Sequence, residues 1–147
     1  MGKWEHLFRD GEFARRGEIL AGLTVEQVTR RPSPQSHTIY EELWHATRWQ
    51  SIIVNRDEAL YAEWQAGRVY PEAEPASEAE WEALVAEFTG GVEKALWWTA
   101  SPERLAHETD PGSTMADVLR SLAVHSSYHL GKIVALRQFI GAWDKKG

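Results

Sequence analysis

Apolar side chains recur at helical spacing in four segments of the chain, separated by stretches rich in proline, glycine and polar residues. The first segment runs from about Trp4 to Gly22, although Gly11 and Gly17 lower its helix propensity. The sequence RRPSPQS contains two prolines and predicts a loop after this helix. No segment shows the alternation of apolar and polar residues that is typical of strands, so the pattern predicts an all-α protein.

The three later segments each open with Ser or Thr followed three residues on by an acidic residue, which is the pattern of a capping box. The helices expected from them span residues 38–65, 77–98 and 114–140. The stretch AGRVYPEAEPAS is the one connection long enough for a crossover or for a wall over a pocket. The stretch TASPERLAHETDPGS is expected to form a loop with at most one short turn. Four helices in a chain of this length predict one domain, residues 1–147, folded as a four-helix bundle.

Composition excludes several classes of function. The net charge of −6 gives no basic surface for nucleic acid, so none is expected as a partner. The absence of cysteine excludes disulfides, thiolate metal ligands and a cysteine nucleophile. No apolar run approaches the ~18 residues of a membrane span, and the N-terminal residues lack the apolar core of a signal peptide. We therefore expect a soluble cytoplasmic protein that does not bind membranes.

Two histidines lie four residues apart in the last expected helix, His125 and His129. At that spacing two side chains share a helix face with their Cβ atoms about 5–6 Å apart, so both imidazoles can reach one metal ion. Two ligands seldom hold a divalent ion, and His45 is the best third candidate because aromatic and apolar residues surround it within the second expected helix. Of the other histidines, His37 and His107 are expected at the surface, and His6 lies between polar neighbours in the first expected helix.

Three neutral imidazoles would leave coordination positions open, which is typical of a catalytic rather than a structural ion. Nitrogen ligands suit zinc, nickel, iron or copper and do not select one of them. The alternative is that these are ordinary histidines, because a single histidine is more often a hydrogen-bonded core or surface residue than a ligand.

Further residues near the second-helix histidine are candidates for supporting roles. Glu41 and Glu42 lie about one turn before His45 and can hydrogen-bond a ligand histidine, although exposed helix glutamates are the favoured interpretation. Trp49, four residues after His45, can line a pocket or simply pack in the core or an interface. Arg137, eight residues after His129 on roughly the same side of the helix, can meet an anion, although a surface ion pair is the favoured interpretation.

The two segments that contain these histidines resemble a known family. SHTIYEELWHATRWQ, followed some eighty residues later by STMADVLRSLAVHSSYHLGKIVALRQFIG, resembles the DinB/YfiT-like superfamily of metal-dependent proteins. That family has a histidine in helix two, matched by His45, and a His-x-x-x-His-x-Gly-(Gln/Lys)-Ile run in helix four, matched by residues 125–133. The stretch LAGLTVEQVTRRP is similar to the family's link between helices one and two. Lys132 stands where many members carry Gln, which alters the charge near the site.

The resemblance implies a bundle of up-down-down-up topology in which His45, His125 and His129 bind one divalent metal ion. Zinc or nickel is the expected ion, with iron, manganese or copper as alternatives. It also implies a homodimer and, from characterised members, chemistry on low-molecular-weight thiols. A bound ion would lower the pKa of a coordinated thiol or water. Because the chain has no cysteine, any reacting thiol would come from a small-molecule cosubstrate.

Three functions follow as expectations. The first is a metal-dependent enzyme, either a thiol S-transferase or a hydrolase that uses metal-bound water. The second is a non-catalytic bundle that binds metal or oligomerises in a stress response. The third, a DNA-associated factor, is suggested only by the family's damage-inducible name and is disfavoured by the net charge of −6.

Overall fold

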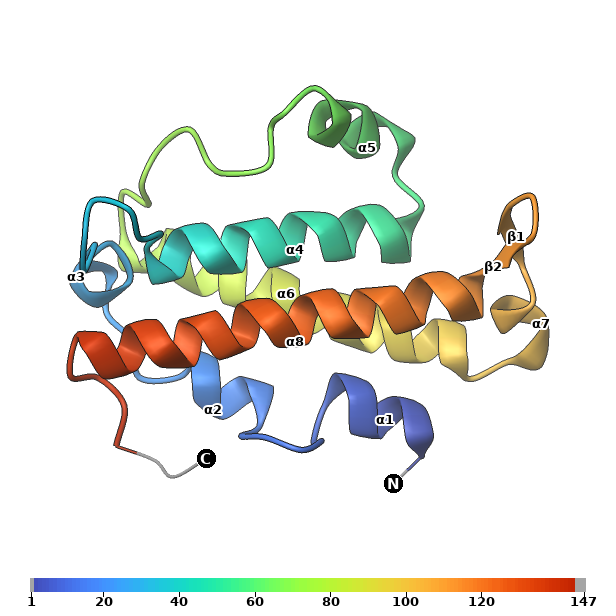
Figure 1. Cartoon of the computed structure of the whole chain (residues 1–147), viewed down its shortest axis with the longest axis horizontal. Coiled ribbons are helices and arrows are strands. Elements are labelled where there is room, and N and C mark those ends of the chain that lie inside the picture. The colour runs from blue at the N-terminus through green and yellow to red at the C-terminus, as the bar shows by residue number, and fades with distance from the viewer. Residues whose placement is uncertain (1, 145–147) are drawn as a thin grey trace.

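The computed structural model describes residues 2–144 and shows long helices packed side by side (Figure 1). Within these residues the helices are α1 Lys3–Phe8, α2 Arg16–Leu20, α3 Val25–Val28, α4 Ile39–Asn55, α5 Glu58–Gln65, α6 Glu78–Thr99, α7 Pro102–Leu105 and α8 Met115–Phe139. Two short strands, β1 Glu108–Asp110 and β2 Ser113–Thr114, form an antiparallel hairpin. The all-α bundle predicted from the sequence is confirmed, with α1 and α2 together in the place of the first long helix.

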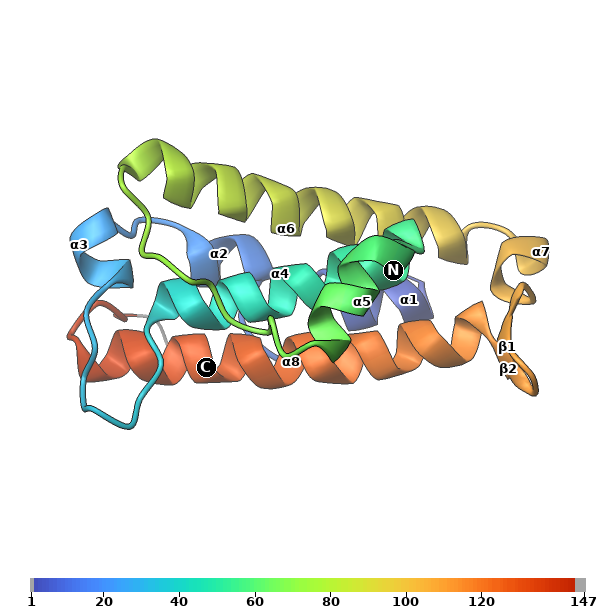
Figure 2. The same cartoon turned by 90° about the horizontal axis from the view of Figure 1, so that it is seen from above.

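The helices follow the up-down-down-up order implied by the family resemblance. The α1–α2 segment runs in one direction along the bundle, α4 and α6 both run in the opposite direction, and α8 returns (Figures 1 and 2). Since α4 and α6 are parallel, the chain between them must travel back along the bundle. Residues 56–77 make this crossover, and they carry α5 across the outside of α4.

The starts of the long helices agree with the capping residues in the sequence. The hydroxyl oxygens of Thr38, Ser77 and Thr114 each accept a hydrogen bond from the backbone N–H three residues later. These bonds satisfy backbone donors that the first helical turn leaves without partners. Gly141 follows α8 with a φ of 73°, the left-handed conformation expected just after a helix.

The single first helix predicted over residues 4–22 is wrong, because the structure breaks it between α1 and α2. Glycine at position 11 weakens the helix there. The guanidinium of Arg16 is buried and donates to the main-chain oxygens of Leu7 and Arg9, the carbonyls at the end of α1. A side chain thus takes the place of the backbone donors that would have continued the helix.

The second helix predicted over residues 38–65 is also wrong in its length, because α4 ends at Asn55 and α5 begins at Glu58. Arg56 lies between them in the left-handed region, with a φ of 50°. The indole N–H of Trp98 donates to the carbonyl oxygen of Val54 at 2.7 Å, which competes for an acceptor that a continuous helix would use. The side chain of Asp57 then caps α5.

The expectation of no strands is wrong for residues 108–114. The hairpin is too short for an alternating pattern to be visible in the sequence, and Gly112, with a φ of 80°, provides its turn. The same connection contains α7, the one short helical turn that the sequence allowed.

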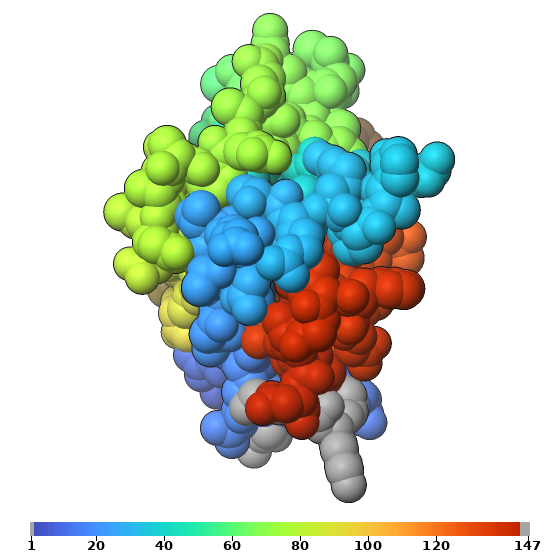
Figure 3. All heavy atoms as spheres, turned by 90° about the vertical axis from the view of Figure 1, so that its left-hand side faces the viewer, coloured from blue at the N-terminus to red at the C-terminus, as the bar shows by residue number. Residues whose placement is uncertain are grey.

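Apolar side chains from α4, α6 and α8 fill the core between the helices, and α1 to α3 add Phe8, Ile19 and Val28 to it. The loop around α3 covers one end of the bundle against the C-terminal part of α8 (Figure 3). Arg137 is buried at this end and donates to the carbonyl oxygens of Ile19 and Ala21, so the surface ion pair predicted for it is wrong. No helix within residues 2–144 has both the length and the apolar character needed to cross a membrane.

Candidate metal centre

The structure brings together the three histidines that the sequence selected. His45 comes from α4, and His125 and His129 come from successive turns of α8, which packs beside α4 (Figure 1). One possible ligand atom from each histidine lies within 4.8 Å of the other two. The ring centroids are 4.5 Å apart for His45 and His129, 4.5 Å for His125 and His129, and 5.3 Å for His45 and His125. We call these residues the histidine cluster.

Hydrogen bonds fix the orientation of two of the three rings. Nδ1 of His45 donates to the carbonyl oxygen of Val69 at 2.8 Å, and Nδ1 of His129 lies 2.6 Å from Oε2 of Glu42. In a neutral imidazole whose Nδ1 carries the proton, the lone pair is on Nε2. Each ring therefore keeps Nε2 available as a metal ligand. Nδ1 of His125 is buried and has no hydrogen-bond partner in the described part of the chain. A bound ion would give this ring the partner that it lacks.

Burial keeps His45 and His125 of the cluster in the neutral form that binds metals. Burial, together with the nearby rings of His129 and His45, lowers the pKa of His125 to about 4. Burial also lowers the pKa of His45, against the opposing effect of its hydrogen bond to Val69. Both imidazoles are consequently unprotonated near pH 7, as metal coordination requires.

Glu42 is the buried acidic group of the site, with 1% of its surface exposed. Besides His129, it contacts Nδ1 of His37 at 3.0 Å and Nζ of Lys132 at 3.3 Å. Burial opposes ionisation of this carboxyl group, but the hydrogen bonds from His129 and His37 and the charge of Lys132 outweigh it and lower its pKa to about 2. The interpretation of Glu42 as an exposed helix residue is wrong, because it lies three residues before His45 and shares the face of α4 that packs on α8.

Glu41, the other acidic candidate, does not reach the histidine cluster. One of its carboxylate oxygens accepts a hydrogen bond from the backbone N–H of Thr38 at 2.8 Å and pairs with Arg31 at 2.9 Å. These contacts close the cap of α4. Of the two glutamates proposed to support a ligand histidine, only Glu42 contacts one.

Aromatic rings cover the cluster on the side of the crossover. The rings of Trp64 and Tyr70 each lie 4.7 Å from the ring of His45. The ring of Trp49 lies 6.2 Å from that of His125 and 5.2 Å from that of Trp64. Figure 2 shows how α5 and the loop after it pass over the α4–α8 pair. The long connection is thus a wall over the site, and Trp49 borders the site as the sequence allowed.

The remaining histidines differ in their distance from the site. His6 pairs with Glu12 at the surface, and His107 is exposed beside the hairpin. His37 is only partly exposed, and its ring lies 4.1 Å from that of Tyr70 while it contacts Glu42. The prediction that His37 is a plain surface residue is therefore incomplete. Its position just before the cap of α4 was the signal, since it places the side chain one turn from Glu42.

A protein family matches most of the chain. A family model described as the DinB superfamily matches residues 14–133, which extend from the residues before α2 into α8 and include the whole histidine cluster. The chain belongs to the DinB superfamily. No curated protein and no solved structure gives a significant match.

The residues present in this DinB protein fit a divalent metal ion. The cluster offers three imidazole nitrogen donors. Two of the rings are held by a hydrogen bond on their other nitrogen, and the third has a buried nitrogen without a partner among residues 2–144. Such contacts to the second ring nitrogen are usual for histidines that bind metals. The set of donors suits a borderline ion and does not select one metal.

Proposed function

We propose that this DinB protein is a metal-dependent enzyme in which His45, His125 and His129 hold one divalent ion. The observation that supports this most strongly is the convergence of three ligand atoms within 4.8 Å, with burial lowering the pKa of His45 and His125. When bound, the ion would act as a Lewis acid that lowers the pKa of a coordinated thiol or water. We propose zinc or nickel as this ion, with iron, manganese or copper as alternatives, because the nitrogen donors do not select one metal.

The proposed reaction is the transfer of a low-molecular-weight thiol to an electrophilic small molecule. The thiol must come from a cosubstrate because the chain contains no cysteine. Within the site, Glu42 holds the ring of His129, and the aromatic rings of Trp64 and Tyr70 lie against one side of His45. These aromatic surfaces can pack against an organic substrate, which favours a transferase over the alternative, a hydrolase that uses metal-bound water.

Metal titration of purified protein tests the site. After removal of bound metal with a chelator, wild type is expected to bind about one equivalent of zinc or nickel. His129→Ala is expected to bind at least tenfold more weakly, because one of the three donors is lost. His6→Ala is the matched control, since that histidine lies outside the cluster. Circular dichroism identifies any variant that fails to fold, and in that case His125→Asn replaces His129→Ala. Equal affinity in the cluster variant and the control would refute the metal site.

Turnover distinguishes an enzyme from a binding protein. The metal-loaded protein is incubated with a panel of small thiols and electrophilic acceptors, and consumption of the thiol is followed. We expect metal-dependent transfer with at least one pair, lost in His125→Asn. If metal binds but no pair reacts, a non-catalytic role is the better assignment.

One surface feature supports that second candidate, an oligomerising bundle. Val124, Tyr128 and Phe139 on α8 are 72%, 62% and 79% exposed, and the spacing of four and eleven residues places them along one face of the helix. We propose this face as the contact of a homodimer. Light scattering on wild type and Tyr128→Glu tests it: a wild-type dimer that the charge converts to a monomer supports the proposal, and a wild-type monomer contradicts it.

A further inference from the structure

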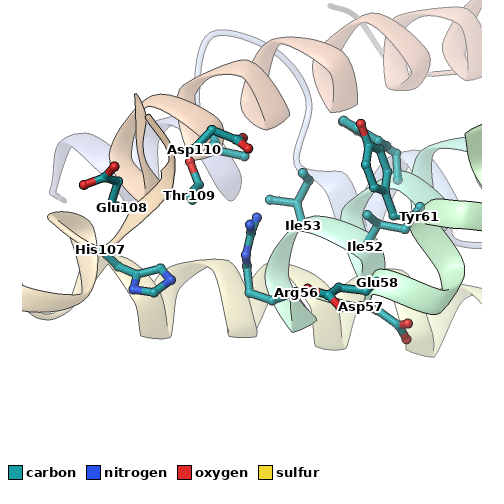
Figure 4. A pocket seen from close by; sticks show the side chains of 12 residues that line it. Ile52, Ile53, Arg56, Asp57, Glu58, Tyr61, His107, Glu108, Thr109 and Asp110 are labelled. Carbon is teal, nitrogen blue, oxygen red and sulfur yellow. The ribbon is translucent and has the colours of Figure 1, made fainter. Parts of the chain in front are cut away.

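A cavity of about 620 Å³ lies between the C-terminal end of α4, the start of α5 and the β1–β2 hairpin (Figure 4). This volume is within the range of small-molecule binding sites. Ile52 and Ile53 of α4 and Val118 of α8 form apolar parts of its lining, and the two isoleucines are mostly buried in the bundle. The cavity therefore has a firm apolar base on the long helices.

The cavity adjoins the histidine cluster through one aromatic side chain. Trp49 lines the cavity, and its ring lies 6.2 Å from the ring of His125. On the same side, Tyr61 lines the cavity and its ring lies 6.2 Å from that of Trp49. Trp49 thus belongs to the lining of the cavity and also lies beside the cluster.

Two opposite charges occupy the middle of the cavity. Figure 4 shows the side chain of Arg56 extending from the end of α4 into the space below the hairpin, where Asp110 and Thr109 lie across from it. Within residues 2–144, no ion pair or side-chain hydrogen bond engages Arg56 or Asp110, although both line the same space. A guanidinium and a carboxylate that share a cavity without pairing leave both groups available to a ligand.

The other charged residues of the lining are arranged differently. The carboxylate of Asp57 accepts a hydrogen bond from the backbone N–H of Leu60 and is used as the cap of α5. The carboxylates of Glu58 and Glu108 point away from the middle of the cavity in Figure 4. Arg56 and Asp110 are therefore the charged pair that a ligand in the middle would meet.

The backbone of Arg56 adds an independent observation. Among residues 2–144 it is the one non-glycine residue with a positive φ, 50°. Glycine adopts this conformation at the end of a helix without strain, whereas a side chain makes it unfavourable. Glycine would be the more favourable residue for the backbone at this position. The arginine is therefore better explained by a role of its side chain than by the local backbone geometry.

We propose that this cavity binds a small molecule that carries an ammonium and a carboxylate group, as an α-amino acid does. The carboxylate pairs with Arg56, whose planar guanidinium suits bidentate contacts, and the ammonium pairs with Asp110. An apolar substituent packs on the isoleucines and extends toward Trp49. Binding of this ligand class is independent of the metal, whereas its assignment as substrate rests on the proposed function.

Three matched probes test the proposal on metal-free wild-type protein: L-phenylalanine, phenethylamine, which lacks the carboxylate, and 3-phenylpropionate, which lacks the ammonium. Dissociation constants come from calorimetry or from tryptophan fluorescence. We expect phenylalanine to bind at least about fivefold more tightly than either of the other two probes, which is the gain in affinity that one close charge pair provides in water. Equal binding of all three probes, or no binding at millimolar concentration, would overturn the proposal.

Two variants separate the charged contacts. Arg56→Gly is expected to weaken the binding of phenylalanine and of 3-phenylpropionate and to leave the binding of phenethylamine unchanged. The temperature midpoint of unfolding should stay the same or rise. Asp110→Asn is expected to weaken the binding of phenylalanine and of phenethylamine and to leave the binding of 3-phenylpropionate unchanged. Glu82→Gln, an exposed carboxylate of α6 outside the cavity, controls for net charge and should alter none of the three. If Arg56→Gly and Asp110→Asn leave all affinities unchanged, the cavity does not hold this ligand.

A further variant distinguishes failure of this proposal from failure of the proposed function. His129→Ala removes a proposed metal donor but no residue of the cavity lining. It is expected to retain the preference for phenylalanine. If the preference persists while neither wild type nor the variant loads metal, the ligand class stands and the metal-dependent enzyme is refuted.

Discussion

Oε2 of Glu42 lies 2.6 Å from Nδ1 of His129, and both side chains are buried between α4 and α8. A carboxylate that accepts the Nδ1 proton fixes the tautomer and the orientation of the imidazole and increases the basicity of Nε2. The positive charge of Lys132, 3.3 Å from the other carboxylate oxygen, stabilises the buried anion. The contact thus prepares one ring of the histidine cluster for an ion.

Glu42→Gln tests this contact. Glutamine keeps the shape of the side chain but removes the charge, so the amide holds the His129 ring less firmly. Metal affinity is expected to fall by about 10–100-fold, the usual effect of losing such a partner. A competition titration with a coloured zinc chelator measures it.

Glu41→Gln is the control for this experiment. This substitution makes the same change from carboxylate to amide at the neighbouring residue. The contacts of Glu41 are with Thr38 and Arg31 and not with a cluster histidine, and glutamine keeps the cap of α4 because it serves at that position of a capping box. Its metal affinity should equal that of wild type. Equal affinities in the two variants would mean that Glu42 has no role in metal binding.

Local sequence patterns predicted the histidine cluster, whereas tertiary contacts determine its surroundings. The spacing of His125 and His129 is a property of one helix, and the position of His45 inside another helix placed it toward the bundle. Nothing local shows that Glu42 lies opposite His129, or that the crossover places Tyr70 on His45, because these contacts join residues far apart in the chain.

The same distinction applies to the fold. The capping residues located the starts of α4, α6 and α8, since a cap acts within a few residues. The breaks after α1 and α4 depend on Arg16 and Trp98, whose side chains capture carbonyl oxygens of those helices from elsewhere in the chain. A periodic pattern of apolar residues contains no trace of such a bond, so both helices appeared continuous.

The glycine pair in α6 gives a matched stability test. A Cβ atom on Gly91 would lie 2.0 Å from Nε2 of Gln50, a fully buried side chain that donates to the carbonyl oxygen of Phe88. A Cβ atom on Gly90 would have no atom of residues 2–144 within 4 Å outside its chain neighbours and the backbone of its own helix. Gly91→Ala should lower the free energy of unfolding by about 1–3 kcal/mol through overpacking. Gly90→Ala should raise it by about 0.5–1 kcal/mol through helix propensity. Urea titrations compare the two, and stabilisation by both would contradict the close packing.

Arg137 connects the end of α8 to the start of the chain. Its guanidinium donates to the carbonyl oxygens of Ile19 at 2.7 Å, Ala21 at 2.9 Å and Ala142 at 2.9 Å. Arg137→Met leaves these acceptors without their donor, and we expect a loss of about 2 kcal/mol or more in the free energy of unfolding.

The exposed Arg120 provides the comparison for Arg137. It pairs with Asp117 on the surface of α8 at 3.2 Å, and such pairs contribute little. Arg120→Met should therefore cost less than about 1 kcal/mol. Chemical denaturation of both variants measures the difference, and losses of equal size would show that the buried contacts of Arg137 contribute no more than a surface pair.

The low pKa of His125 makes the stability of the metal-free protein depend on pH. Burial holds this pKa at about 4 in the folded protein, against an ordinary value of 6.5. Between these values the unfolded chain binds a proton that the folded protein does not, so stability falls as the pH decreases from 6.5 to 4. The loss attributable to this ring is about 1–3 kcal/mol, since each pKa unit corresponds to ~1.4 kcal/mol and the ring is partly exposed.

Urea unfolding at pH 7.5 and 4.5, with a chelator present, measures this loss. His125→Asn should lose less stability over that interval than wild type, while keeping the part that arises from the lowered pKa of His45. Glu42 does not affect this comparison. Its pKa is lowered from 4.5 to about 2 in the folded protein, so the stability that its ionised form contributes is lost only below about pH 4.5. If wild type and His125→Asn lose the same stability, the ring of His125 takes up a proton as readily in the folded as in the unfolded protein, and it is not the desolvated donor that metal binding near pH 7 requires.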